Sequence, residues 1–276
     1  MRAEGDIPRQ SRARPGPALA AKGLCGLADS RRAREWADFA HCLAGRALPA
    51  QNHLVDILAR EDRRRLLTIC ERVTLVLGQV VCDPDTPTRH LYFPIDSFIS
   101  MVATVAGSPG VEVGMVGREG LLGSHVVLGT GTTTLRGVVQ GPGSALRVAR
   151  IPFRRELETS ASLRRVLDRY VAVLMVQLSI SAVCLRYHQI GPRLARWLLM
   201  SHDRAGTDTF RITHEFLSYM LGVRRVGITS AASELQRRGI IEYRRGHLTV
   251  LNRIKLESAS CPCYAADRRA YSGALN

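Results

Sequence analysis

The hydrophobic pattern is sharpest between residues 212 and 250, where it changes from helical spacing to alternation. Apolar residues at helical spacing follow Thr213, a residue type that caps helices, and they predict a short amphipathic helix that ends at Gly222. A second helix is predicted over 224–238, with apolar positions on one face and polar or basic positions elsewhere. Alternation around the basic turn at 244–246 then predicts a β-hairpin. Helix, glycine turn, helix and basic hairpin is the order of a winged helix-turn-helix.

Upstream, short apolar runs are separated by turn residues. Helical spacing is confined to residues 54–70. The runs rich in β-branched or aromatic residues lie at 73–77, 80–82, 91–93, 98–105, 111–116, 135–140 and 145–151. Short strands at even spacing, divided by clusters of Gly, Pro and Asp, predict a β-sandwich or jelly roll.

A long helix is predicted after Pro152. Side chains repeat along it in alternating steps of four and three, which is the spacing of a seam that packs against a second helix. The seam residues are Val166, Tyr170, Val173, Gln177, Ile180, Cys184 and Tyr187. A second apolar stripe follows the same rhythm beside the seam. One stripe can therefore pack against the chain's own β-domain and the other against a second copy of the chain. A single helix buried within one monomer has the same periodicity, so that alternative stays open.

These elements divide the chain into five segments of an α+β fold. They are an N-terminal extension at 1–51, a jelly-roll sensor domain at 52–155, a dimerisation helix at 156–190, a winged helix-turn-helix at 191–257 and a C-terminal tail at 258–276. The extension lacks sustained periodicity. It is either a basic arm that contacts a polyanion or an appendage with no role.

Charge indicates a polyanionic partner. The 276 residues include 39 Lys and Arg against 24 Asp and Glu, a formal net charge of +15. Residues 189–276, with fourteen basic and seven acidic side chains, carry the largest part of the net charge. Basicity alone does not distinguish DNA, RNA and a membrane surface. The helix-turn-helix favours double-stranded DNA, because the N-terminal end of a recognition helix enters the major groove, where arginines bind guanine or phosphate.

Three motifs carry a resemblance to a known protein family. Leu221–Arg225 (LGVRR) forms the turn, Tyr243–Gly246 (YRRG) forms the tip of the hairpin, and Cys261–Tyr264 (CPCY) lies near the end of the chain. They resemble the DNA-binding domain of the Crp/Fnr family of bacterial transcription regulators, and the resemblance extends upstream to about Asn52. It implies a jelly roll of the cyclic-nucleotide-binding type and a homodimer on a palindromic operator. It also implies RNA polymerase as a further partner.

The resemblance and the helix periodicity together divide the expected DNA contacts into two sets. The expected base-reading residues are Arg225, Val226, Thr229 and Ser230. The expected phosphate-binding residues are Thr213, Arg224, Arg244 and Arg245. Val226 and Ser230 stand where many members have Glu and Arg. The operator should therefore differ from the family's best-known half-site.

The sensor motif departs from the family pattern. Members that bind cyclic nucleotides have a Gly-Glu-Leu core for the ribose and an arginine for the cyclic phosphate. Here Leu121 replaces the carboxylate, threonines such as Thr133 replace the arginine, and Arg118 and Arg136 are displaced from the pattern. A buried phosphate without a guanidinium partner is poorly stabilised. We therefore expect a degenerate pocket that binds neither cyclic AMP nor cyclic GMP, and we predict no cofactor.

Seven cysteines, an odd number without disulfide-scaffold spacing, predict reduced thiols in a cytoplasmic protein. No membrane partner is expected, because no apolar run approaches membrane-spanning length. Cys25 and Cys42 are too far apart to match the N-terminal cysteine cluster of the family's oxygen sensors. Cys261 and Cys263 lack a nearby His or further Cys in the sequence, so we expect them to serve packing and predict no metal site.

Two other functions remain open. One is a metal- or redox-responsive regulator that uses its cysteine thiols. The other is a cupin-like enzyme, which the scattered histidines and the absence of an activated nucleophile disfavour.

Overall fold

The computed structural model describes residues 52–106 and 110–275, so the predicted extension at 1–51, with Cys25 and Cys42, lies outside the described residues. The first half contains α2 (His53–Asp56), α3 (Arg60–Thr68), β1 (Cys70–Leu75), β2 (Val80–Cys82), β3 (His90–Pro94), β4 (Phe98–Ala103), β5 (Val111–Val116), the short 3₁₀ helix η3 (Ser124–Val126), β6 (Leu135–Gly141) and β7 (Gly143–Ala149). The second half contains α4 (Arg150–Thr159), α5 (Ala161–Tyr187), α6 (Ile190–Ala205), β8 (Thr209–Arg211), α7 (His214–Leu221), α8 (Arg225–Arg237), β9 (Ile241–Arg244), β10 (His247–Val250), α9 (Arg253–Ala259) and α10 (Cys263–Leu275).

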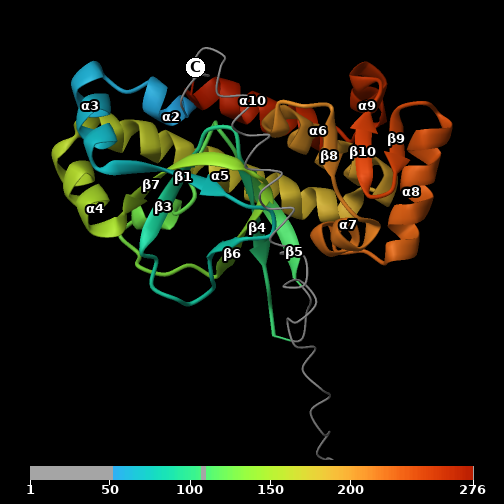
Figure 1. Cartoon of the computed structure of the whole chain (residues 1–276), viewed down its shortest axis with the longest axis horizontal. Helices are drawn as coiled ribbons and strands as arrows, with labels where there is room; N and C mark the ends of the chain where they lie inside the picture. The colour runs from blue at the N-terminus through green and yellow to red at the C-terminus, as the bar shows by residue number, and fades with distance from the viewer. Residues whose placement is uncertain (1–51, 107–109, 276) are drawn as a thin grey trace, which may run out of the picture. The chain divides into compact units, whose positions relative to one another are not determined.

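Seven of the strands form two antiparallel sheets, with the strand orders β1-β7-β3 and β2-β6-β4-β5 (Figure 1). Neighbours such as β1 and β7 are far apart in sequence, so long-range pairing holds the sheets together. Each run rich in β-branched or aromatic residues that was predicted upstream of residue 152 overlaps one of these strands. The α+β class and the N-terminal β-sandwich are confirmed.

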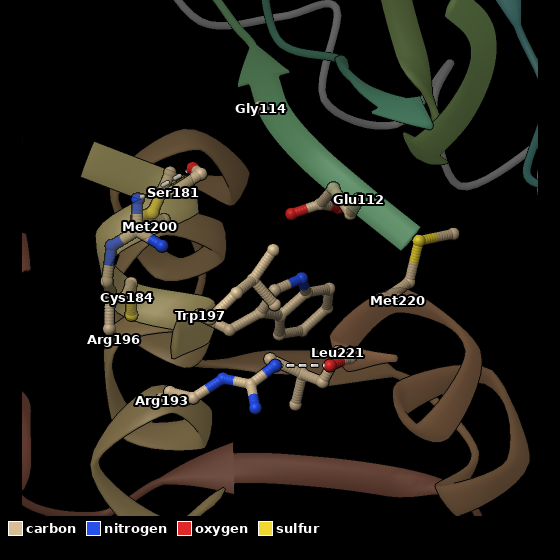
Figure 2. A pocket seen from close by; sticks show the side chains of 11 residues that line it. Glu112, Gly114, Ser181, Cys184, Arg193, Arg196, Trp197, Met200, Met220 and Leu221 are labelled. Atoms are coloured by element: carbon tan, nitrogen blue, oxygen red, sulfur yellow. Dashed lines mark hydrogen bonds between the residues drawn. The ribbon is translucent and has the colours of Figure 1, made fainter. Parts of the chain in front are cut away.

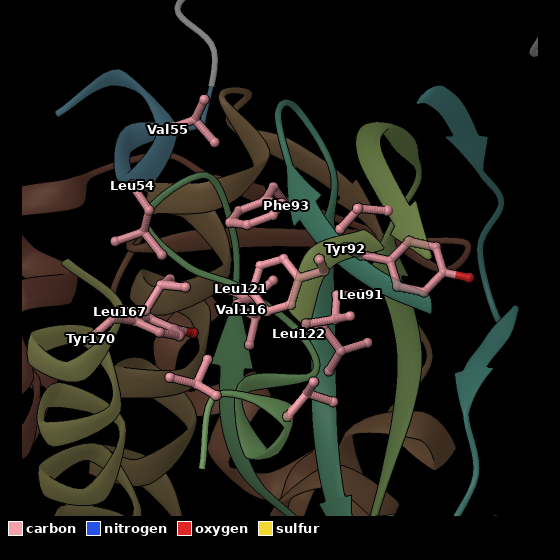
Figure 3. Close-up of a cluster of buried hydrophobic side chains, with 14 of the residues drawn as sticks. Leu54, Val55, Leu91, Tyr92, Phe93, Val116, Leu121, Leu122, Leu167 and Tyr170 are labelled. Carbon is pink, nitrogen blue, oxygen red and sulfur yellow. The ribbon is translucent and has the colours of Figure 1, made fainter. Parts of the chain in front are cut away.

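The core of the β-domain is filled by apolar side chains from both sheets and from α5 (Figure 3). Leu91 and Phe93 of β3 and Val116 of β5 are at most 1% exposed. Leu167 and Tyr170 of α5 are fully buried in the same cluster. The helix that follows the sandwich is therefore part of its core.

The single long helix predicted after Pro152 is two helices. Residue Ser160 separates α4 from α5 and has extended backbone angles, with φ −106° and ψ 101°. Its side-chain oxygen accepts a hydrogen bond from the backbone N–H of Leu163 at 3.0 Å. Serine in this role satisfies an N–H that the first turn of a helix leaves without a partner. The cap explains why α5 starts at Ala161.

The predicted dimer seam is wrong for five of its seven residues, because these five face the chain's own core. The seam residues buried within the single chain are Val166, Tyr170, Val173, Gln177 and Cys184. Ile180 is half-buried, and Tyr187 is 73% exposed. Gln177 shows what covers this stripe: its Oε1 accepts from the backbone N–H of Met115 in β5 at 3.2 Å, and its Nε2 donates to the Tyr271 hydroxyl in α10 at 3.1 Å. For this stripe, burial within one monomer is the correct interpretation.

The segment predicted as a C-terminal tail contains the helix α10, which packs along α5 (Figure 1). Its inner side includes Tyr264, Asp267 and Leu275, each at most 5% exposed. Asp267 is paired with Arg196 of α6 at 2.6 Å, which compensates the burial of its carboxylate. Helix α10 therefore covers the predicted seam together with β5.

Within the described residues, α5 is long and apolar enough to cross a membrane, with a mean hydropathy of 1.6 in its most apolar window. The expectation that no apolar run approaches this length is wrong for α5. Its packing explains the composition, because one side contacts β5 and α10. The core helix of a soluble protein meets the same criteria of length and composition.

Candidate nucleic-acid interface

Helices α7 and α8 meet at a tight turn that two local features define. The hydroxyl of Thr213 accepts a hydrogen bond from the Phe216 N–H at 3.1 Å and caps α7. Gly222 ends α7 in the left-handed conformation, with φ 61° and ψ 41°. A Cβ at this position would also lie 3.1 Å from Cγ2 of Val111 in β5. Glycine is required here both by the backbone angle and by the close approach of the β-domain.

The start of α8 is exposed on one side and buried on the other. The buried side has Ile228, Ala232 and Leu235, each at most 3% exposed. All four predicted base-reading residues, Arg225, Val226, Thr229 and Ser230, lie on the exposed side. Arg224 is the exposed N-cap of the helix. Helix N-termini carry a partial positive charge, so two arginines here form a concentrated positive end.

A small network that the sequence did not predict fixes this end of α8. The Thr229 hydroxyl donates to the Arg225 carbonyl at 3.1 Å and lies 3.0 Å from Nδ1 of His214. With its own proton committed, the hydroxyl accepts from His214, which places the histidine proton on Nδ1. The His214 ring stacks on Tyr243, with centroids 4.4 Å apart. Burial, and secondarily the nearby Arg225, lower the pKa of His214, which favours this neutral form.

The β9–β10 hairpin, here called the wing, is held by hydrogen bonds to α8 and to Ile212, which lies between β8 and α7. The Tyr243 hydroxyl donates to the Ile212 carbonyl at 2.9 Å, and the Tyr243 N–H donates to Oε1 of Gln236 in α8 at 3.1 Å. The Ile212 N–H donates to the Gly246 carbonyl at 2.8 Å. Strand β8 pairs with β10 and adds a third strand to the hairpin. The wing is therefore held firmly beside α8.

Arginine occupies a left-handed position at the tip of the wing. Arg245 has φ 50° and Gly246 has φ 80°. Positive φ at two successive central residues is the geometry of a type I′ hairpin turn, which favours Asn-Gly. Arg244 and Arg245 are both exposed. The two side chains are therefore available to a phosphate backbone.

The predicted ligand-pocket residues occupy different environments. Leu121 is fully buried in the apolar core shown in Figure 3. Arg136 forms an ion pair with Asp83 at 2.9 Å, and the Thr133 carbonyl accepts from a backbone N–H at 2.8 Å. Arg118 is exposed and lines a surface cavity of about 870 Å³ beside α10. These four side chains do not form one anion pocket.

The β-domain and the helix-turn-helix meet around a cavity of about 20 Å³ (Figure 2). Arg193 of α6 is buried and donates to the carbonyl of Leu221, the last residue of α7. Glu112 of β5 accepts from the Ser100 hydroxyl at 2.5 Å, and its carboxylate points toward Trp197. Burial raises the pKa of Glu112 to about 7. The sequence did not single out these residues, because no local pattern connects β5 to α6.

A second group missed by the sequence lies at the end of α5. Ligand atoms of Cys184, His188, Cys261 and Cys263 all lie within 4.8 Å of one another. Cys261 and Cys263 therefore have a His and a further Cys nearby in space, although none lies near them in the sequence. One sequence signal was present: Cys184 and His188 are four residues apart, which places them on one side of a helix end.

Comparison with known proteins agrees with these elements. Residues 192–259 match the model of the Crp-like helix-turn-helix domain. No curated protein sequence matches the chain. A structure assigned to the crp/fnr family, from Eubacterium rectale, aligns at a TM-score of 0.60 with 14% identity, over 76% of this chain and 99% of the other.

Two further solved structures are similar over a comparable length. FixK2 from Bradyrhizobium japonicum aligns at a TM-score of 0.59 with 14% identity, over 70% of this chain and 98% of its own. The c-di-GMP responsive global regulator CLP of Xanthomonas campestris aligns at 0.57 with 15% identity, over 70% and 99%. The chain thus carries a Crp-like helix-turn-helix domain joined to a β-domain, and together they have the fold of the Crp/Fnr transcription regulators.

Proposed function

We propose that the chain is a dimeric transcription regulator that binds a specific, palindromic site in double-stranded DNA. The observation that carries this proposal is the exposed start of α8, where Arg224 and Arg225 extend from a rigid Crp-like helix-turn-helix. A DNA partner places the protein in the cytoplasm. RNA polymerase is a further partner in this proposal.

In this proposal Arg225, Val226 and Ser230 read base edges. Arginine suits guanine O6 and N7, and an apolar side chain suits the thymine methyl group. Thr229 has a different part, because its hydroxyl proton is already committed to the Arg225 carbonyl. It presents its methyl group to the groove and holds the first turn of α8 through His214. Arg225 therefore carries most of the hydrogen-bonded base readout.

The phosphate contacts come from both sides of α8. Arg224 lies at its N-cap, Arg244 and Arg245 lie on the wing, and Thr213 caps α7. Because the Thr213 hydroxyl accepts from the Phe216 N–H, its own proton can be donated outward to a phosphate oxygen. Contacts of this kind fix the register of the protein on DNA and carry no sequence information.

Arg225→Ala tests the proposal against the matched variant Arg237→Ala. Arg237 is an exposed arginine at the other end of α8, paired with Glu234 at 2.8 Å. On an operator selected from random DNA, Arg225→Ala should weaken the free energy of DNA binding by about 1–3 kcal/mol and relax the preference at one base pair. Arg237→Ala should change affinity far less. Fluorescence anisotropy on a panel of operator variants measures both, and an unchanged ranking with Arg225→Ala refutes the base-reading role.

Dimerisation uses a third face of α5 in this proposal. The exposed residues of that face are Ala172, Met175, Val176, Ser179, Ala182, Val183, Arg186 and Tyr187. They repeat in steps of three and four, and Met175, Val183 and Tyr187 are 64%, 50% and 73% exposed. A second copy packed along this face would cover these apolar side chains and would present two recognition helices to a palindrome.

Val176→Asp tests this interface, with Ile151→Asp as the matched control. Val176 lies on the proposed face, whereas Ile151 is an exposed apolar residue of α4. A charge in an apolar interface is costly. Val176→Asp should therefore sediment as a monomer and lose operator affinity, while Ile151→Asp should remain a dimer. A dimeric Val176→Asp variant contradicts the assignment of this face.

The fold supports a regulator over a cupin-like enzyme. In the part of the chain that the structure describes, the group of metal-ligating side chains lies at the end of α5 and not between the sheets. The space between the sheets is packed with apolar side chains. A regulator whose thiols respond to metal or oxidant has specific support in the cysteine cluster.

A further inference from the structure

Three elements bring four soft ligands together. Cys184 and His188 lie at the C-terminal end of α5, where His188 is the C-cap. Cys261 precedes α10, and Cys263 is its first residue. Sγ of Cys184 lies 3.5 Å from Sγ of Cys261, and Sγ of Cys263 lies 3.5 Å from Nδ1 of His188. All three cysteines are free thiols and are buried.

These separations match the edges of one small coordination sphere. With Zn–S bonds of about 2.3 Å and Zn–N bonds of about 2.0–2.1 Å, tetrahedral ligands lie about 3.8 Å apart for two sulfurs and about 3.5 Å apart for sulfur and nitrogen. The observed pairs are at 3.5 Å, and the whole set lies within 4.8 Å. Small side-chain rotations suffice to place the four atoms around one ion.

We propose that Cys184, His188, Cys261 and Cys263 bind one zinc ion. Three thiolates and an imidazole form a closed Cys₃His set, which is typical of structural zinc. Soft sulfur ligands disfavour magnesium and calcium, which prefer oxygen. An iron–sulfur cluster places several metal atoms between its cysteines and usually takes four of them. This compact set has room for a single ion.

The surrounding charge suits this ion. Zinc binding releases the three thiol protons to solvent and leaves a site with a net charge of −1. Arg193 and Arg196 of α6 lie beside the cysteines, around the cavity that Cys184 lines. Figure 2 shows the Arg196 side chain beside Cys184, while Arg193 reaches across to the Leu221 carbonyl. They offset the net negative charge that the thiolates bring.

The ion would join α5 to the helix-turn-helix domain that begins with α6, here called the reader domain. Cys184 and His188 end α5, and α6 begins two residues later at Ile190. The Cys261 N–H donates to the Pro192 carbonyl in the first turn of α6 at 3.4 Å. Zinc would therefore fix the end of α5, the start of α6 and the start of α10 as one unit. It would set the angle at which α6 leaves the proposed dimerisation helix.

The experiment uses the full-length protein purified under reducing conditions. Elemental analysis should find about one zinc per chain, and cobalt added to the chelator-treated protein should give the visible absorption of a tetrahedral thiolate site. Cys261→Ser and His188→Ala should each lower zinc content at least about tenfold. The control variant Cys70→Ser, which removes a free cysteine in β1, should keep its full zinc content. A chelator should lower the melting temperature of the wild type and of Cys70→Ser. It should leave the melting temperature of Cys261→Ser unchanged.

Three outcomes overturn the proposal. One is a zinc-free protein that also gives no cobalt spectrum. Another is full zinc content in both ligand variants, which places the metal elsewhere. The third is a Cys184–Cys261 disulfide that forms in mild oxidant in a chain that takes up no metal, which makes the cluster a redox pair. None of these results depends on DNA, so the zinc site and the proposed regulator function can fail separately.

Discussion

A substitution at Arg245 tests whether this arginine lowers the stability of the wing while it raises the affinity for DNA. Its φ of 50° is a conformation that L-residues with a long side chain adopt at a cost of about 1–2 kcal/mol. Asparagine tolerates this conformation, and Asn-Gly is the preferred pair for the turn that Arg245 and Gly246 make. The substitution Arg245→Asn therefore removes a strained residue and a positive charge together.

The two effects should have opposite signs. Relief of strain should raise the free energy of unfolding by up to about 1 kcal/mol, or about 2–4 °C in melting temperature for a chain of this size. Loss of a phosphate contact should reduce the slope of log K against log salt by about 0.9 for each wing, hence about 1.8 for a dimer. The variant should be more stable and should bind every DNA sequence more weakly.

Arg244→Ala is the matched control, because Arg244 ends β9 outside the positive-φ region. It should weaken DNA binding in the same way without stabilising the fold. Differential scanning calorimetry gives the stability, and anisotropy at several salt concentrations gives the slope. A lower melting temperature for Arg245→Asn refutes the turn argument. An unchanged salt slope refutes the phosphate contact.

The remaining predictions concern the β-domain. Burial raises the pKa of Glu112 from 4.5 to about 7, so the folded state binds its proton more tightly than the unfolded chain does. Stability should therefore fall as the pH rises from about 4.5 to about 7, by at most about 3 kcal/mol, and then level off. Glu112→Gln should abolish this slope in urea titrations, and a slope that persists assigns it to another group. Cyclic AMP and cyclic GMP should give no heat in titration calorimetry at micromolar concentration, because Leu121 is buried in the core and Arg136 is paired with Asp83. A low-micromolar constant abolished by Arg136→Ala would reverse that conclusion.

The sequence predicted the elements well where the signal was local. The two helices and the hairpin of the reader domain follow from Thr213, Gly222 and a period that changes from helix to strand. The strands of the β-domain follow from short apolar runs and the turn residues between them. Caps, left-handed glycines and side-chain periodicity act within a few residues, so they can be recognised without knowledge of the fold.

Two errors, the predicted dimer seam and the apparent isolation of Cys261 and Cys263, have one cause. The sequence analysis did not predict helix α10. Treating residues 258–276 as a tail left the stripe that contains Gln177 and Cys184 without a partner inside the chain, so a second copy was assigned to it. The same omission left Cys261 and Cys263 without Cys184 and His188. A signal was present, because Tyr264, Tyr271 and Leu275 recur at helical spacing. Asp267 interrupts that apolar face, and only its ion pair with Arg196 explains how it can be buried.

The packing of the reader domain suggests how the β-domain can influence DNA binding. Val111, at the start of β5, lies against Gly222 in the turn that precedes α8, and Arg193 holds the carbonyl of Leu221 in the same turn. A shift of β5 or α6 therefore reaches the recognition helix through the turn that precedes it. The four-ligand cluster contacts the first turn of α6, which is also the turn that contains Arg193. Coupling requires an element with two arrangements that both sites bias. Helix α6 is the element here that contacts both the cluster and the turn.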